Sequence, residues 1–260
     1  MSLEGINSES QSAPIAGDEM DLQSSPVVPR FQWYLPLKAG VERAIALVLF
    51  VLVLPLLALL AALVKFTSPG PAFYSQSRVG RNHRIFLMHK LRTMRHCCEA
   101  ETGPVWSMPN DNRITRVGRF LRKTHLDELP QLLNVLQGHM CLIGPRPERP
   151  EICKQIENTI PRFRERLQIH PGMTGLAQTQ LPSDTGMHTV RRKLAYDLYY
   201  IREVNPWLDA RIALSTLLYL CGVVFHSLGR RMVSPYGMAA ENDDEMRDLT
   251  DSEESEIPVT

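Results

Sequence analysis

The stretch DNRITRVGRFLRKTHLDELPQLLNVLQGHMCLIGPRP, residues 111–147, carries most of the information about this chain. It begins with four arginines at intervals of three residues, a spacing that keeps side chains near one face of a helix. Cations so close together repel one another unless an anion neutralises them, and the planar guanidinium fork matches phosphate oxygens. The pattern predicts either a solvated basic surface or a phosphate-binding site, formed by Arg113, Arg116, Arg119 and Arg122.

Two adjacent acids, Asp127 and Glu128, follow the arginines. Inside a helix they would point about 100° apart, so both could face one site only near a helix end. Pro130 predicts such an end near Asp127, because proline is tolerated best in a first turn. At the positive end of that helix, beside arginines, both acids should favour the ionised form that a nucleophile or a Mg²⁺ ligand needs. The alternative is a pair of helix-capping acids without chemistry.

Towards the N-terminus, Ala44 to Val64 forms a run of apolar residues without a charge. As a helix it would be about 31 Å long, close to the thickness of a bilayer's hydrocarbon core. It lies too far from the N-terminus for a signal peptide, so it predicts a membrane segment. Pro55 interrupts the run and favours a kink. Two topologies stay open: a kinked helix that spans, or a re-entrant helix broken at Pro55 that enters and leaves by one face.

Charge is unevenly distributed around a net of +1. Residues 65–238 hold 25 Lys and Arg against 13 Asp and Glu, whereas the tail from Glu241 holds nine acids and one arginine. The basic part suits anionic lipid headgroups and phosphorylated substrates. The five cysteines lack zinc-ligand spacing and indicate a reducing compartment.

The fold class predicted from these patterns is α+β and mostly helical, with a membrane-embedded N-terminal helix and a small catalytic domain. Four regions are expected: a disordered extension (1–30), a membrane-associated helix (31–66), the catalytic domain (67–238) and a disordered acidic tail (239–260). A Gly80-Arg-Asn turn should join two short strands, and residues 207–225 should form a helix lying in the membrane interface. Expected strands are 72–74 and 84–88, and expected helices are 115–123, 128–137, 148–158, 161–168 and 189–202.

Six sequence blocks occur in an order that resembles the bacterial sugar transferase family, the monotopic polyprenyl-phosphate phosphoglycosyl transferases. The resemblance covers residues 38–223. The blocks are SPGP (68–71), RVGRN (78–82), KLRTM (90–94), residues 111–138, LIGPRPE (142–148) and PGMTGLAQ (171–178).

The resemblance implies transfer of a sugar 1-phosphate from a nucleotide sugar, with UDP as the expected nucleotide, to polyprenyl (undecaprenyl) phosphate. A nucleoside monophosphate is released at the cytoplasmic face of the bacterial inner membrane, as the first step of exopolysaccharide, capsule or lipopolysaccharide synthesis. Asp127 would be the nucleophile that forms an aspartyl-phosphosugar, and Glu128 would hold Mg²⁺, with Mn²⁺ as a substitute. The expected substrate-binding residues are Lys90, Arg92, Arg113, Arg122, Pro145, Arg146 and Pro147.

The resemblance also implies a re-entrant helix, which in the family breaks at a Ser-Pro step. Here the step is Leu54-Pro55, and His125, His139 and Cys141 depart from the residues common in their blocks. The resemblance is also compatible with contacts to downstream glycosyltransferases and with oligomer formation. The alternative function is a membrane-anchored scaffold or lipid-binding protein that has lost catalysis. Nucleic acid is not an expected partner, because Phe120 is the one Phe, Tyr or Trp between residues 111 and 147.

Overall fold

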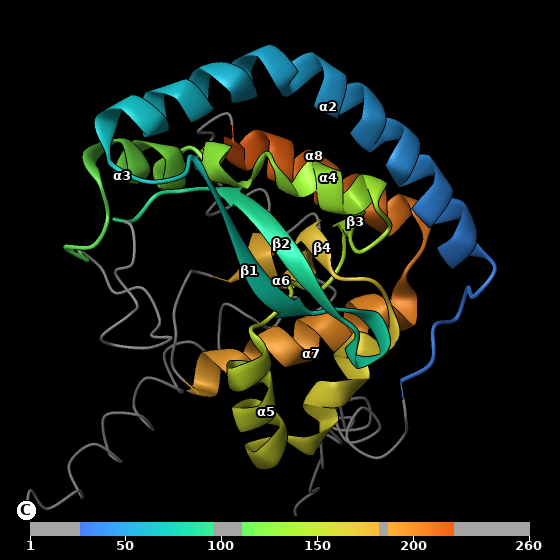
Figure 1. Ribbon diagram of the computed structural model, residues 1–260. Helices are drawn as coiled ribbons and strands as arrows, with labels where there is room; N and C mark the ends of the chain where they lie inside the picture. The colour runs from blue at the N-terminus through green and yellow to red at the C-terminus, as the bar shows by residue number, and fades with distance from the viewer. Residues whose placement is uncertain (1–26, 96–110, 182–186, 221–260) are drawn as a thin grey trace, which may run out of the picture.

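A long apolar helix, α2 (Tyr34–Thr67), arches over the rest of the protein in the computed structural model (Figure 1). The structure describes residues 27–95, 111–181 and 187–220. The predicted membrane segment lies inside α2, and Pro55 lies within this helix, which continues on both sides of it. Proline removes a single backbone hydrogen bond, and a curved helix can accommodate that loss.

One face of α2 packs against the domain below it, on α3, α4 and β3. The helix contributes to all three hydrophobic core clusters, through Tyr34 near its start, Ala46 further along, and Leu57, Leu60 and Val64 near its end. Its other faces expose apolar side chains, among them Val48, Leu52, Leu59 and Phe66. Among the described residues, α2 is the one helix that is long and apolar enough to cross a membrane.

A twisted hairpin lies beneath α2. Strands β1 (Phe73–Val79) and β2 (Ile85–Leu91) pair antiparallel, from Phe73 opposite Leu91 to Val79 opposite Ile85. Both strands are longer than predicted, because cross-strand pairing continues to the turn. The turn contains the short 3₁₀ helix η1 (Arg81–His83), in which Asn82 and His83 have positive φ.

A second, parallel pair of short strands was not predicted from the sequence: β3 (Cys141–Ile143) and β4 (Gly172–Thr174). The two backbones approach closely just beyond β3. A Cβ atom on Gly172 would lie 2.1 Å from the backbone nitrogen of Gly144, so glycine is required here. Three-residue strands leave too little pattern to recognise.

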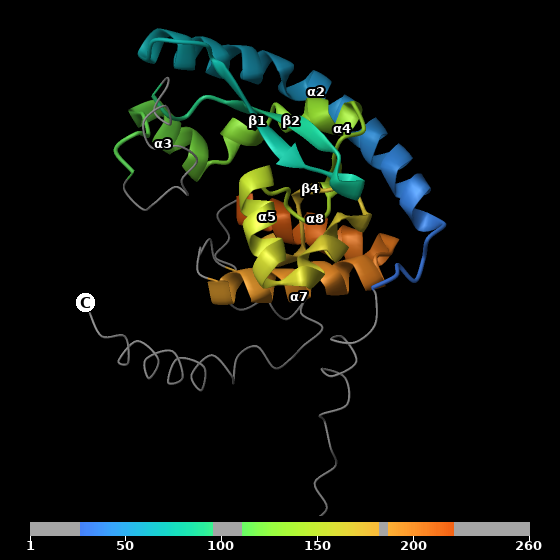
Figure 2. The same ribbon diagram turned by 60° about the horizontal axis from the view of Figure 1, so that its bottom comes forward.

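The remaining elements follow the predicted order, and Figure 2 shows α5 and α7 on the side of the hairpin away from α2. The five predicted helices correspond to α3, the turn-plus-helix η2 and α4, α5, the 3₁₀ segment η3, and α7. The predicted helix 207–225 is described as far as residue 220. The bounds are α3 Arg116–Lys123, η2 Leu126–Glu128, α4 Gln131–Leu136, α5 Pro150–Thr159, η3 Pro161–Gln168, α6 Leu176–Gln180, α7 Met187–Glu203 and α8 Pro206–Leu220.

Several predicted features lie outside the described residues: most of the N-terminal extension, the acidic tail, and Cys97 and Cys98. The boundaries drawn between the four regions stay predictions.

Candidate active site

Glu128 is the centre of a compact cluster of charges. Its Oε1 accepts hydrogen bonds from Lys90 Nζ and Arg146 Nη2, each at 2.6 Å, and its Oε2 accepts one from Arg146 Nη1 at 3.3 Å. These residues come from η2, β2 and the loop after β3. Burial opposes ionisation of Glu128, but the charges and hydrogen bonds of Arg146 and Lys90 outweigh it and hold its pKa well below the ordinary value. Glu128 is therefore a fixed anion.

Asp127 has a different environment, although it is the next residue. Its side chain is buried, and no described residue donates a hydrogen bond to its carboxylate. Burial raises its pKa above the ordinary value, while the charges of Lys90 and Arg122 act in the opposite direction. The prediction that both acids favour ionisation is confirmed for Glu128 and wrong for Asp127, because desolvation of Asp127 outweighs its basic neighbours.

The dyad lies on a tight turn between two helices. Helix α3 ends before His125, which adopts a left-handed conformation (φ 56°), and η2 follows at once. Pro130 is the N-cap of α4, so the helix begins at Gln131 rather than near Asp127. The predicted helix start was therefore early by about one turn, and the short 3₁₀ turn, not the first turn of α4, carries the acids.

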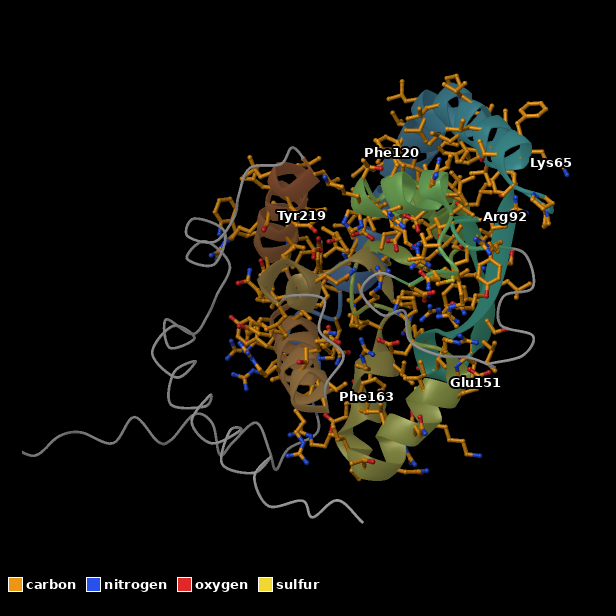
Figure 3. All side chains as sticks on the ribbon, turned by 90° about the vertical axis from the view of Figure 1, so that its left-hand side faces the viewer. Lys65, Arg92, Phe120, Glu151, Phe163 and Tyr219 are labelled. Atoms are coloured by element: carbon orange, nitrogen blue, oxygen red, sulfur yellow. The ribbon has the colours of Figure 1, made fainter. Side chains whose placement is uncertain are left out.

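Arg92, predicted to bind substrate, is tied to the C-terminal end of α2. Its guanidinium donates to the carbonyl oxygens of Ser68 and Pro69, at 2.7 Å each, and to Val64 O at 3.4 Å. Figure 3 shows Arg92 and Lys65 at this end of α2. The last carbonyls of a helix have no intrahelical partner, and Arg92, the residue after β2, donates to one of them, Val64 O, and to the two carbonyls that follow the helix. In this structure its guanidinium anchors the end of α2 and forms no hydrogen bond with Glu128.

The arginine series does not form one surface. Arg113 precedes α3 and pairs with Asp111, whose pKa it lowers to about 2 through hydrogen bonds. Arg122 donates from Nε to Thr93 Oγ1 at 2.8 Å and is the member whose charge acts on Asp127. Arg116 and Arg119 are exposed. Of the four, Arg122 is therefore the one placed beside the dyad.

Buried contacts hold the loop that carries Arg146. Pro145 O accepts from Gly172 N at 2.9 Å, and Pro147 O accepts from Arg78 Nη1 at 3.0 Å. Arg146 O accepts from Nη2 of Arg166, a buried residue on η3. Pro145 and Pro147 make these contacts through their backbone carbonyls, and their expected part in substrate binding stays a prediction. Sequence reasoning missed Arg78 and Arg166, because nothing in their spacing separates them from surface arginines.

A buried ionic cluster ties the start of α2 to the same domain. Lys38 pairs with Glu42 and, at 2.9 Å, with Asp209 of α8. Asp209 also accepts from the hydroxyl groups of Tyr34 and Tyr200, at 2.7 Å each. Glu42 accepts from the backbone nitrogens of residues 142 and 143, in the strand that leads to Arg146. Both ends of α2 are therefore bonded to one folded unit.

The fold, the acid dyad and the Arg146 loop together define a member of the bacterial sugar transferase family. The model of that family matches residues 33–222, and the chain belongs to it. The chain is 38% identical over 185 residues to a UDP-N-acetylgalactosamine-undecaprenyl-phosphate N-acetylgalactosaminephosphotransferase of Aeromonas hydrophila, covering 71% of this chain and 43% of that protein.

Two relatives are described as UDP-glucose:undecaprenyl-phosphate glucose-1-phosphate transferases. The protein of Xanthomonas campestris pv. campestris is 38% identical over 75% of this chain and 41% of its own length. The protein of Caulobacter vibrioides is 43% identical over 69% of this chain and 68% of its own length. The chain thus matches less than half the length of the Aeromonas and Xanthomonas relatives.

The donor groups at the dyad are compatible with Mg²⁺. The described residues contain no group of three or more His, Cys, Asp or Glu side chains that could enclose a metal ion. Mg²⁺, however, is commonly bound by one or two carboxylates together with substrate phosphates. Asp127 and Glu128 can supply such carboxylates, provided that the cation shares Glu128 with Lys90 and Arg146.

Proposed function

We propose that the protein transfers a sugar 1-phosphate from a UDP-sugar to undecaprenyl phosphate and releases UMP. The observation that carries this proposal is the contrast within the dyad: Asp127 is buried and receives no hydrogen bond from any residue that the structure describes, whereas Glu128 is fixed by Lys90 and Arg146. An unpaired carboxylate next to a cationic cluster can attack phosphorus while the cations neutralise charge on the leaving phosphate. The names of the relatives support the same donor and acceptor classes.

In the first displacement, an Asp127 carboxylate oxygen attacks the phosphorus that bears the sugar. The bond from that phosphorus to the bridging oxygen of the diphosphate breaks, and UMP leaves with the bridging oxygen. Asp127 must be ionised to attack, and the charges of Lys90 and Arg122 favour its anion against the effect of burial. The product is an acyl phosphate, which is reactive enough to pass the group on.

In the second displacement, a phosphate oxygen of undecaprenyl phosphate attacks the same phosphorus. The bond to Asp127 breaks, the carboxylate is regenerated, and the lipid carries a diphosphate-linked sugar. Arg146 and Lys90, which both contact Glu128, are proposed to bind phosphate oxygens in both steps. When bound, Mg²⁺ would neutralise phosphate charge, with Glu128 as its protein ligand.

We also propose that α2 is monotopic, entering and leaving the membrane from the cytoplasmic side. A helix that spans must place its ends on opposite sides of about 30 Å of hydrocarbon. Here Lys38 near one end and Arg92 at the other end are both bonded to the same domain, while the outer apolar faces of the helix remain available to lipid.

The reaction is tested with purified protein in nanodiscs, Mg²⁺, undecaprenyl phosphate and a panel of UDP-sugars. UMP release that depends on the lipid and on one sugar is expected, and Asp127→Asn should abolish it. Intact-mass analysis without the lipid acceptor should show a sugar-phosphate adduct on the wild type and on Asp111→Asn, but not on Asp127→Asn. Folded protein that releases no UMP with any sugar would overturn the proposal and favour a non-catalytic scaffold.

Topology is tested with single cysteines introduced at Gln32, before α2, and at Asn82, in the hairpin turn. The single cysteines are introduced into a variant in which Cys97, Cys98 and Cys221 are replaced, while the buried Cys141 and Cys153 are kept. A monotopic helix predicts that both positions resist a membrane-impermeant thiol reagent in intact cells and react after lysis. Labelling of Gln32→Cys alone in intact cells would show a spanning helix.

A further inference from the structure

The tip of the β1–β2 hairpin contains a second cationic site, away from the dyad. An open cavity of about 310 Å³ is lined by Arg81, Asn82, Arg84 and His170. Arg84 and Lys90 are six residues apart along the hairpin, which corresponds to about 20 Å in an extended strand. The hairpin-tip site, defined by these four lining residues, is therefore separate from the Glu128 cluster.

Positive groups surround this cavity. The pKa of His170 is lowered by burial and by the charges of Arg81, Arg43 and His139. Arg43 extends from α2 to within contact of the backbone at Gly138, where an added Cβ would lie 2.6 Å from its Nη2. Like charges gathered in this way leave a positive potential that an anion would relieve.

Acidic side chains do not neutralise the cluster. Among the described residues, no carboxylate forms an ion pair with Arg43, Arg81 or Arg84. The acid near the turn is Glu157, whose oxygens lie 3.8 Å from His83 Nδ1 and 3.5 Å from Arg164 Nε. Glu157 is thus already shared between these two basic residues.

Backbone contacts hold the turn in one shape. Gly80 N donates to Arg84 O at 2.8 Å, and Arg84 N donates to Arg81 O at 3.2 Å. Arg81 Nε donates to Gln168 O at 3.1 Å, so its terminal nitrogens remain as donors to a ligand. Asn82 adopts a positive φ of 53°, a conformation that costs energy in a non-glycine residue. The backbone of the turn and the Arg81 side chain are thus positioned before a ligand arrives.

We propose that the hairpin-tip site binds a phosphate-bearing anion. Two guanidinium groups with an imidazole and an amide provide the planar, multiple donors that phosphate oxygens accept. Arg43 lies on α2, other faces of which expose apolar side chains such as Val41 and Ile45. This position favours the headgroup of an anionic phospholipid as the source, and free phosphate is the other source of the same chemistry.

The site is tested with the full chain in phosphatidylcholine nanodiscs, without nucleotide sugar or undecaprenyl phosphate. Binding of short-chain phosphatidylglycerol and of inorganic phosphate is followed by thermal shift at constant ionic strength. The double variant Arg81→Gln/Arg84→Gln is compared with Arg116→Gln/Arg119→Gln, which removes the same charge from exposed positions on α3. Melting without any anion shows that each variant is folded.

A saturable shift with phosphatidylglycerol that weakens at least tenfold in the hairpin-tip variant, but less than twofold in the α3 variant, would support a lipid headgroup site. A similar loss with inorganic phosphate would identify the free anion as ligand. Equal weakening in both variants would show non-specific charge attraction only and would overturn the proposal, as would the absence of any saturable shift. Because no substrate is present, these outcomes do not depend on the proposed transferase activity.

Discussion

Replacing Arg166 by methionine should destabilise the protein strongly, because it leaves a buried charge without a partner. Arg166 Nη2 lies 2.7 Å from Asp197 Oδ2, and the two side chains are 6% and 3% exposed. Removing one partner of a buried pair costs about 3–5 kcal/mol. The substitution also removes a cation–π contact, in which the guanidinium carbon lies 4.6 Å from the centre of the Phe163 ring. The energy of this contact is small enough to be covered by the same range.

Arg164→Met is the matched control, two residues away on η3. Arg164 also has an acidic partner, but its side chain is 65% exposed, and an exposed ion pair contributes about 0–1 kcal/mol. The free energies of unfolding of the two variants, measured by urea titration in the same detergent, should therefore differ by at least about 2 kcal/mol. The double variant Arg166→Met/Asp197→Leu should recover most of the loss, because it removes both buried charges.

The pH dependence gives an independent check. Burial raises the pKa of Asp197 above its ordinary value even with Arg166 present, and the variant removes the cation that opposes this rise. A carboxyl group with a raised pKa in the folded state binds a proton more tightly when folded, so stability falls as pH rises towards that pKa. The loss of unfolding free energy caused by Arg166→Met should therefore become smaller as the pH is lowered from 8 to 5. A deficit equal to that of Arg164→Met, or one independent of pH, would refute the reasoning.

The same substitution should affect turnover, because Arg166 donates to the carbonyl oxygen of Arg146. At a temperature where the variant is fully folded, UMP release should still fall, since the loop that carries Arg146 loses a fixed contact. Unchanged turnover would mean that Arg166 has a purely structural role.

Three further substitutions have distinct expected outcomes. Lys38→Met leaves two buried carboxylates without their cation and should cost about 3–5 kcal/mol in urea unfolding; a change below about 1 kcal/mol would show that the cluster does not hold α2 in place. Glu128→Gln removes the anion that pairs with Lys90 and should raise the Mg²⁺ concentration for half-maximal UMP release, and an unchanged requirement would exclude Glu128 as the metal ligand. Gly172→Ala places a Cβ 2.1 Å from the nitrogen of Gly144, so the yield of folded protein and the melting temperature should both drop. A melting temperature equal to that of the wild type would show that β3 and β4 can move apart without cost.

Much of the fold could be predicted from local patterns. The apolar run within α2, the hairpin and the main helices have periodicities and turn residues that neighbouring residues alone specify. The adjacent acids and the Gly-Pro-Arg-Pro loop likewise indicated the site from residue types and order. The start of the helix that follows the dyad was placed less well, because a 3₁₀ turn and a first helical turn share the same sequence signals.

The amino-acid sequence by itself determined the family, the membrane-associated helix and the pair of acids, since these depend on composition and on spacing along the chain. Only the tertiary structure decided that Asp127 is desolvated while Glu128 is paired, that Arg92 is bonded to the end of α2, and that α2 continues through Pro55. It also brought Arg166 to the loop of Arg146. The physical reason is that burial and ion pairing depend on residues distant in sequence, and an arginine has the same local pattern whether it meets a phosphate, a carboxylate or the carbonyl end of a helix.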